Sequence, residues 1–234
     1  MSVFSESIYV LKKALFPNRC AICGDIIEFD RELCDECLSA KKIKSPVCLK
    51  CGCEKADCIC KKNTHKPEYK AIVAPYYYYQ DSISRGILNC KMNDLPSLTE
   101  AQGREIANTV KSLYELIDFD CVTYIPMRKY DEKYRGFNQS KLLAEKVADI
   151  CSLKCEDLLI KKRKTKMQKR QSAKNRYVNM YNAFDLAENA EIKDKTILII
   201  DDVKTTGATL SSASLTLKAY GAKEVYCAVL AIVK

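Results

Sequence analysis

The sequence lacks several features that would place it in familiar classes of protein. None of its 234 residues belongs to an apolar run approaching about 18 residues, so no membrane-spanning helix is expected. The N-terminal stretch carries Glu6, Lys12 and Lys13 where a secretion signal would be apolar, which makes a poor signal peptide and favours a cytoplasmic location. The single histidine, His65, excludes repeated histidine chemistry, and we expect it to be a solvated linker residue.

Acidic residues are missing from one stretch. Residues 160–180 contain nine basic side chains and no acidic one, a charge equal to the formal excess of +9 for the whole chain. The remainder is close to neutral, so the protein is not generally basic. A basic segment of this kind is expected to meet an anion, and a solvated charged surface is the plainer alternative.

Cysteine is abundant instead, and nine of the 14 cysteines lie between Cys20 and Cys60. They form C-x2-C pairs separated by ten residues and end in a C-x-C pair. Two thiolates this close can bind one metal ion, and a second pair completes the tetrahedral set of four sulfurs that suits zinc. We therefore predict two structural zinc ions with sequential pairing, although interleaved pairing is also possible. The predicted ligands are Cys20, Cys23, Cys34, Cys37, Cys48, Cys51, Cys58 and Cys60.

The remaining features of this segment agree with zinc. A disulfide scaffold is disfavoured because the chain has no secretion signal. Gly24 and Gly52 follow the second cysteine of their pairs, where such turns often need a positive φ. Cys53 is either an alternate ligand or a bystander. Because the segment has few apolar residues, we expect the metal to supply most of its stability.

After about residue 69 the pattern changes to alternating strands and helices. Apolar and β-branched runs predict strands at 71–79, 121–126, 196–202 and 224–233. Helical spacing predicts helices at 82–92, 98–116, 138–150 and 208–220. Strands that are apolar throughout indicate an α/β fold, with a mostly parallel sheet and helices on both faces. Ligands of such sheets bind at the carboxyl ends of the strands.

That rule points to Asp201 and Asp202, which end a buried strand. A loop of small and hydroxylic residues follows and runs into a helix. The backbone N–H groups at such a helix N-terminus favour a phosphate monoester, and the two carboxylates can accept hydrogen bonds from a vicinal diol. Phosphate plus diol indicates ribose 5-phosphate. The loop residues are Thr205, Thr206, Gly207, Ala208 and Thr209.

The run ILIIDDVKTTGAT, residues 197–209, resembles the PRPP-binding motif of type I phosphoribosyltransferases. The segment IPMRKYDEKYRGFNQS (125–140) and the pattern R-x-T-x-x-Q at Arg163, Thr165 and Gln168 resemble the ComF family of competence-associated proteins. A double zinc ribbon is the other mark of that family. The resemblance implies a type I phosphoribosyltransferase-like fold, with an N-terminal helix at 1–17, the ribbon at 18–64 and the transferase-like domain at 65–234.

The resemblance also implies roles for residues. Asp201 and Asp202 would hold the ribose hydroxyls, the loop 205–209 would hold the 5-phosphate, and Mg2+ would bridge pyrophosphate and ribose oxygens. The candidates for the pyrophosphate loop are Arg128, Lys129, Arg135 and Gly136. The basic stretch would be a hood loop that closes over the site, and it could also bind single-stranded DNA, although its sole aromatic residue is Tyr177. The hood or nucleic-acid candidates are Lys161, Lys162, Arg163, Lys164, Gln168 and Arg176.

The acceptor of the expected transfer is not revealed. Purine-salvage members of the fold have a general-base Asp where this chain has Thr205, which disfavours purine-base chemistry. No N-terminal cysteine nucleophile is present for glutaminase activity. We expect a PRPP- and Mg2+-binding phosphoribosyltransferase acting in DNA uptake or DNA processing, with a competence ATPase or helicase as a candidate partner. The alternative is a non-catalytic component of the uptake machinery that binds single-stranded DNA or protein and uses PRPP or a nucleotide only as a ligand.

Overall fold

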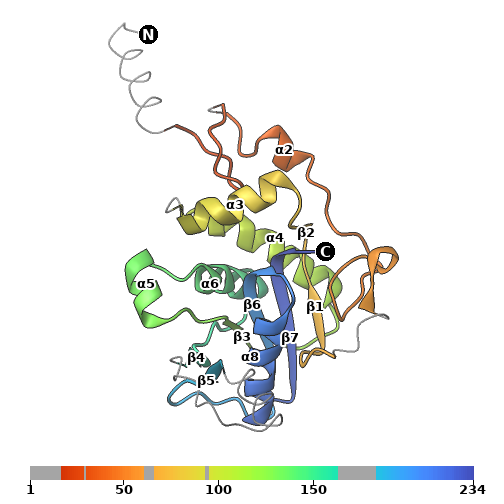
Figure 1. Ribbon diagram of the computed structural model, residues 1–234, viewed down its shortest axis with the longest axis vertical. Coiled ribbons are helices and arrows are strands. Elements are labelled where there is room, and N and C mark those ends of the chain that lie inside the picture. Colours follow the sequence, from red (N-terminus) through yellow and green to blue (C-terminus); the bar gives the residue numbers. More distant parts are fainter. Residues whose placement is uncertain (1–16, 29, 61–65, 93–94, 163–182) are drawn as a thin grey trace, which may run out of the picture.

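A computed structural model describes residues 17–28, 30–60, 66–92, 95–162 and 183–234 of the chain (Figure 1). In the described part of the expected zinc-ribbon region, the structure contains a short helix, a 3-10 turn and isolated bridges. The rest alternates between strands and helices, as the sequence predicts. In chain order the elements are α2 (Asp35–Leu38), η1 (Lys55–Asp57), β1 (Ala71–Val73), β2 (Tyr76–Tyr77), α3 (Asp81–Met92), α4 (Leu98–Leu113), β3 (Cys121–Tyr124), α5 (Lys129–Arg135), α6 (Gln139–Cys151), β4 (Leu159–Lys161), β5 (Phe184–Leu186), β6 (Thr196–Lys204), α8 (Ala208–Ala219) and β7 (Glu224–Ile232).

The central sheet is parallel and has the strand order β1-β7-β6-β3, with β2 also paired to β7. The two long strands, β6 and β7, are buried over almost their full length. Burial on both faces explains why their sequences are continuous apolar runs rather than alternating ones. A separate antiparallel pair is formed by β4 and β5.

The strand expected at 71–79 is interrupted. β1 and β2 pair with β7 in one continuous register, because Ala71 lies opposite Tyr226 and Tyr76 opposite Ala231. Pro75 lies between them, and proline has no N–H to give to the ladder. The β-branched and aromatic run therefore predicted a strand here correctly, although the missing donor divides it in two and β2 ends at Tyr77.

Helices cover both faces of the sheet and create two cores. Leu198 and Ile200 of β6 pack with buried residues of α3, α4 and α6. Ile197 and Ile199 of the same strand point the other way and pack with α8. This alternation follows from the period of two along a strand. Among the described residues, no helix is long and apolar enough to cross a membrane.

The cysteine-rich segment lies against this frame as two ribbons. We call residues 17–40 the first ribbon and 43–60 the second ribbon. The first ribbon lies over α3, and the second lies beside β1 (Figure 1). Cys20, Ile22 and Cys23 of the first ribbon belong to the same core as α3 and α4. The metal was expected to supply most of the stability of this segment, and the structure adds that the first ribbon also shares the apolar core.

Three further differences from the sequence expectations concern local structure. The helix expected at 98–116 ends at Leu113, three residues earlier. The segment after Ile125, expected to be a loop, contains the short helix α5. Of the helix expected at 1–17, only residue 17 is among the described residues. The linker residue His65 lies outside them.

Candidate functional site

The candidate site lies at the carboxyl end of β6, where the structure places the two acids. Consecutive strand residues point to opposite faces, so the carboxylates of Asp201 and Asp202 have different partners. Ser140, in the first turn of α6, donates its hydroxyl to Asp201 Oδ1 at 2.7 Å. The Asp202 carboxylate forms an ion pair with the ammonium group of Lys91, in the last turn of α3. Three elements distant in the sequence therefore meet at this point.

The environment of Asp201 changes its acidity. Burial and the neighbouring carboxylate of Asp202 raise the pKa of Asp201 to about 7. Hydrogen bonds from Ser140 and from the Asp202 N–H oppose this rise, as does the charge of Lys91. Near neutral pH, Asp201 therefore exists in both forms and can either donate or accept a hydrogen bond.

The phosphate-loop residues predicted from the sequence follow directly. Gly207 has a φ of +81° and stands at the N-cap position of α8. Because glycine adopts this conformation without strain and offers no capping side chain, the first-turn N–H groups of α8 face the loop. The Ala208 N–H reaches the Thr206 hydroxyl at 3.3 Å. The side chains of Thr205, Thr206 and Thr209 are exposed and can reach a phosphate.

The pyrophosphate-loop candidates lie between β3 and α6. Arg128 is the N-cap residue of α5, Lys129 begins this helix, and Gly136 ends it with a φ of +83°. Arg135 Nη1 lies 3.7 Å from the sulfur of Met127. In the described part of the chain, none of the four forms a hydrogen bond or ion pair with Asp201 or Asp202. Their proposed contact with a ligand remains a prediction.

Only the stem of the expected hood loop is described. Lys161 ends β4, which pairs with β5 across the segment 163–182. Lys162 follows and forms an ion pair with Asp185 at 3.2 Å. Arg163, Lys164, Gln168 and Arg176 lie outside the described residues.

Sequence reasoning missed three residues at the site. Lys91 and Ser140 come from helices whose apolar patterns were recognised, but a pattern does not show which polar residue faces another element. Gln139 is almost fully buried beside Ser140, and its amide nitrogen and oxygen find no partner among the described residues. A buried amide without partners is costly, so it fits a place where water or a ligand binds.

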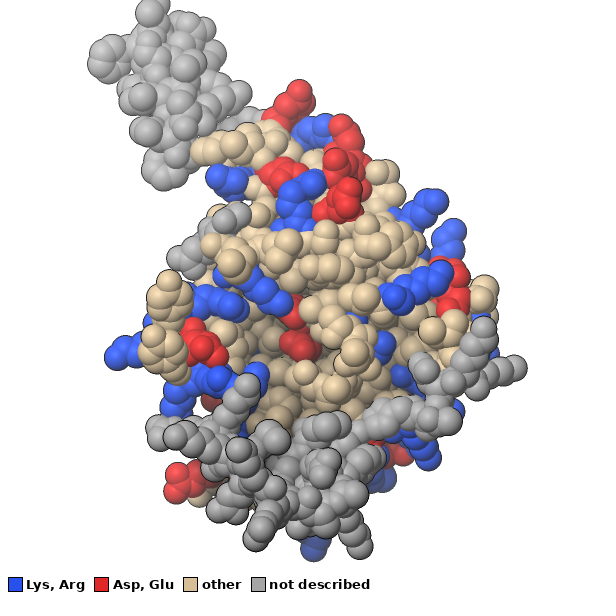
Figure 2. Space-filling model, viewed as in Figure 1, with Lys and Arg blue, Asp and Glu red and all other residues tan. Residues whose placement is uncertain are grey.

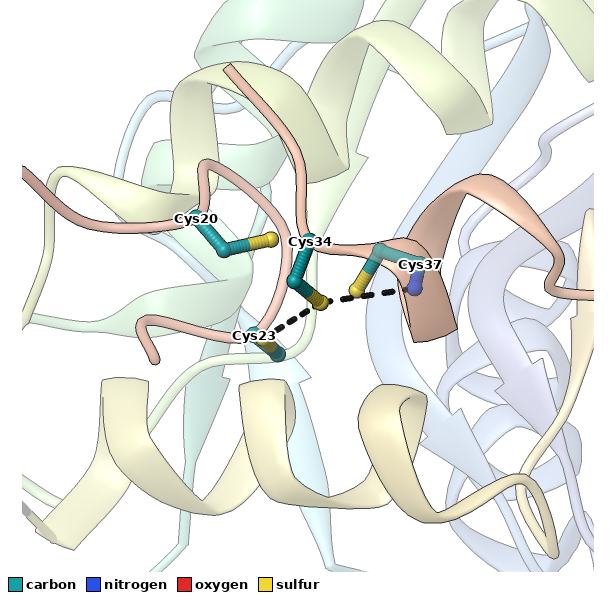
Figure 3. Close-up of side chains that lie close together, drawn as sticks. All are labelled: Cys20, Cys23, Cys34 and Cys37. Carbon is teal, nitrogen blue, oxygen red and sulfur yellow. Dashed lines mark hydrogen bonds between the residues drawn. The ribbon is translucent and has the colours of Figure 1, made fainter. Parts of the chain in front are cut away.

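The cysteines form the two predicted groups. Cys20, Cys23, Cys34 and Cys37 converge in one group, and Cys48, Cys51, Cys58 and Cys60 in the other, with all ligand atoms of a group within 4.8 Å. Figure 3 shows the four sulfur-bearing side chains of the first group drawn together from a loop and from α2. This grouping agrees with sequential pairing. Cys53 belongs to neither group and is buried against Tyr69 and Ile72, which makes it a bystander.

The geometry of both groups fits zinc. The Cys23–Cys34 sulfur separation is 3.6 Å, and Cys51–Cys58 is 3.8 Å. Sulfurs bound at about 2.3 Å in a tetrahedron lie about 3.8 Å apart. Gly24 and Gly52 have φ values of +82° and +81°, as the turns were expected to need.

Domain comparisons agree with this architecture. Residues 138–233 match the phosphoribosyl transferase domain, and residues 11–65 match the double zinc ribbon domain. The fold and its two cysteine groups therefore define a type I phosphoribosyltransferase-like protein with an N-terminal double zinc ribbon.

Curated relatives share this arrangement along most of their length. Competence protein F of Haemophilus influenzae is 28% identical over 224 residues, covering 90% of this chain and 95% of the relative. Competence protein ComFC of Bacillus subtilis is 27% identical over 202 residues, covering 81% and 79% respectively. DNA utilization protein YhgH of Salmonella typhimurium is 25% identical over 220 residues, covering 90% and 96%. The chain is similar along most of its length to these competence and DNA utilization proteins.

Proposed function

We propose that the chain binds PRPP with Mg2+ at the carboxyl end of β6 and acts as a phosphoribosyltransferase in DNA uptake or DNA processing. The observation that carries the proposal is the β6–α8 connection: a buried strand ends in two acids, and a hydroxyl-rich loop leads into a helix capped by Gly207. The names of the relatives, which refer to competence and DNA utilization, support the cellular role.

Each part of PRPP finds a chemical counterpart around this connection. The 5-phosphate fits the N-terminus of α8, where N–H groups and hydroxyls of the loop converge. The ribose hydroxyls fit Asp201 and Asp202, which can accept hydrogen bonds from a diol. The diphosphate requires cations, and Arg128, Lys129 and Arg135 lie in the β3–α6 connection at the same edge of the sheet. Figure 2 shows recessed acidic atoms near the middle of this face, with Lys and Arg side chains on several sides.

Mg2+ is the ion that this chemistry requires. Bound together with PRPP, it would neutralise the charge of the diphosphate. The carboxylates of Asp201 and Asp202 are hard oxygen donors compatible with such an ion nearby. The chain's own residues would have another task, which is to orient the ribose and the phosphate.

The acid pair offers the most direct test. Replacing both carboxylates by amides, Asp201→Asn with Asp202→Asn, should weaken PRPP binding at least a hundredfold, because two charged acceptors for the ribose hydroxyls are lost, at about 1.5–3 kcal/mol each. Isothermal titration calorimetry with PRPP and Mg2+ measures the change. Asp118→Asn is the matched control, since Asp118 is exposed just before β3, at the opposite edge of the sheet.

Two outcomes would count against the proposed function, the first against the PRPP site and the second against catalysis. Unchanged affinity of the double variant would reject the sugar-phosphate site. Wild-type protein that binds PRPP but releases no pyrophosphate from it, when supplied with a metabolite extract, would favour the non-catalytic alternative over the transferase.

A second candidate function, binding of single-stranded DNA, is favoured by helix α5. Tyr130 and Tyr134 lie one turn apart on this helix, and their side chains are 79% and 88% exposed. Lys129 and Lys133 flank them. Exposed rings beside basic residues can stack on bases while the cations contact phosphates. Helix α5 therefore offers exposed aromatic side chains, which are sparse in the basic segment 160–180.

Removal of these rings tests the second function. Tyr130→Ala with Tyr134→Ala should weaken binding of an oligo-dT strand about tenfold or more, because each stacked base contributes about 1–3 kcal/mol. Fluorescence anisotropy gives the affinity, and Tyr79→Ala, which removes an exposed ring elsewhere, is the control. Equal affinities for all three proteins would assign any DNA binding to another surface.

A further inference from the structure

Lys91 connects the acid pair to the first ribbon. Its ammonium group pairs with Asp202, whose side chain is only 7% exposed. A carboxylate this buried needs a counter-charge to stay ionised, and a second carboxylate, Asp201, is its neighbour in sequence. Lys91 supplies that charge from the last turn of α3.

The position of α3 is set by the first ribbon. Asn89 donates its side-chain N–H to the carbonyl oxygen of Cys23 at 2.7 Å. Arg85 forms ion pairs with Asp25 at 2.9 Å and with Glu36 at 2.5 Å, both from the first ribbon. These contacts fall on successive turns of the helix that ends next to Lys91.

The closest approach is at Gly86. A Cβ atom at this position would lie 2.3 Å from the Ile22 carbonyl oxygen and 3.1 Å from the Cys23 Cα. No real Cβ fits there, so the backbone of α3 rests directly on the turn that holds two cysteines of the first group. A metal ion that fixes this turn also fixes the helix, because the contact leaves no space for independent movement.

We propose that Lys91 is a positioning residue of the PRPP site, which pairs with the Asp202 carboxylate and aims it at the ribose, and that the first cysteine group sets the position of Lys91 through α3. This inference rests on the proposed binding of PRPP. On this inference the first ribbon contributes to ligand binding as well as to stability. The loss of its metal would loosen α3 and free the Lys91 ammonium group from Asp202.

Lys91→Met tests the first half of the inference. The variant keeps the length and apolar stem of the side chain but removes its charge, and PRPP affinity should fall about tenfold or more in calorimetry with Mg2+. Lys91→Arg should recover most of the affinity, which a purely structural role of the stem would not explain. In the Asp202→Asn background, Lys91→Met should cause little further loss. Lys70→Met, which breaks the remote pair Lys70–Glu224, is the control and should bind as wild type.

Gly86→Ala tests the second half. It should push α3 away from the first ribbon and weaken PRPP binding several-fold in the wild-type background, yet cause almost no further loss in the Lys91→Met background. Zinc content, measured by elemental analysis, must remain at two ions per chain. If Gly86→Ala does not fold, Asn89→Ala removes the hydrogen bond to Cys23 at a smaller structural cost and should show the same dependence on Lys91.

The outcomes separate this inference from the proposed function. Wild-type protein that binds PRPP, with Lys91→Met binding equally well, would overturn the role of Lys91 and leave the PRPP site intact. The link to the first ribbon would be overturned if Gly86→Ala or Asn89→Ala weakened PRPP binding equally in the wild-type and the Lys91→Met backgrounds. Wild-type protein that does not bind PRPP with Mg2+ would reject the proposed function and this inference with it.

Discussion

The two cysteine groups have the same chemistry but different surroundings. In the first, three of the four cysteines are buried, and the group packs into the core that contains α3 and α4. In the second, all four are only partly buried, and the ribbon lies at the edge of the sheet beside β1 and β7. Four thiolates bind a metal equally well in either place. From this difference we expect the metal of the first group to support a shared core through its own ligands, whereas the second ribbon meets the other core mainly through Cys53, which is not a ligand.

The contacts of the two ribbons agree with this distinction. The first ribbon reaches α4 as well as α3, since the buried amide of Gln102 donates to the Ile22 carbonyl oxygen at 2.9 Å. The second ribbon joins the sheet beside β1: the Ile72 N–H donates to the Leu49 carbonyl at 2.9 Å, and the Tyr69 hydroxyl donates to the Lys50 carbonyl at 3.0 Å. Its non-ligand cysteine, Cys53, is buried in the other core, which contains Ile72.

Removal of one ligand from each group should give the largest difference. Cys23→Ser and Cys58→Ser should each lower zinc content from about two ions per chain to about one. Cys23→Ser should lower the free energy of unfolding by about 4 kcal/mol or more, because the core around α3 loses its support, and Cys58→Ser by about 2 kcal/mol. Elemental analysis and chemical denaturation measure both quantities. Similar losses of stability in the two variants would remove the distinction between the groups.

The sequence predicts each cysteine group and the acid pair well, because both depend on residues close together in the chain. Spacing alone brings four thiolates to one metal, and the end of a buried strand delivers Asp201 and Asp202 to the sheet edge. Lys91 is more than a hundred residues from Asp202, and its helix shows only an apolar face in the sequence. Which ribbon is buried is equally a tertiary property, because it depends on where α3 packs.

Helix α5 escaped prediction for a different physical reason. It has seven residues and none of them is buried, so no apolar periodicity exists to indicate it. The hairpin β4–β5 also escaped, since its three-residue strands are separated by 22 residues of sequence. Short elements held by a few distant contacts leave little trace in the local pattern.

Apolar residues between paired ligands allow a finer comparison that leaves every ligand in place. Ile22 is the second residue between Cys20 and Cys23 and is 4% exposed, whereas Leu49 is the first residue between Cys48 and Cys51 and is 49% exposed. Ile22→Ala should cost about 2–4 kcal/mol of unfolding free energy, the usual cost of truncating a buried aliphatic side chain. Leu49→Ala should cost about 0.5 kcal/mol or less.

Urea denaturation of both variants gives the two losses of unfolding free energy. Zinc content should be confirmed at two ions per chain in each variant. The control is internal, since both substitutions shorten an aliphatic side chain in a turn between two ligands. A cost at Leu49 that equals the cost at Ile22 would mean that the second ribbon is as deeply packed as the first, against the exposures in the structure.

The smallest expected effect concerns the attachment of the second ribbon to the sheet. The Tyr77 hydroxyl accepts a hydrogen bond from the Glu54 N–H at 3.0 Å and donates one to Asp57 at 3.2 Å. Tyr77→Phe removes both bonds without altering the ring and should lower stability by about 1 kcal/mol. Because the ribbon is held at its edge, the variant should also release one of its two zinc ions to a chromogenic chelator faster, while the other ion leaves at the wild-type rate. Faster release of both ions would show that the two groups are coupled through the sheet, and the contrast between a core-supported and an edge-supported metal would then fail.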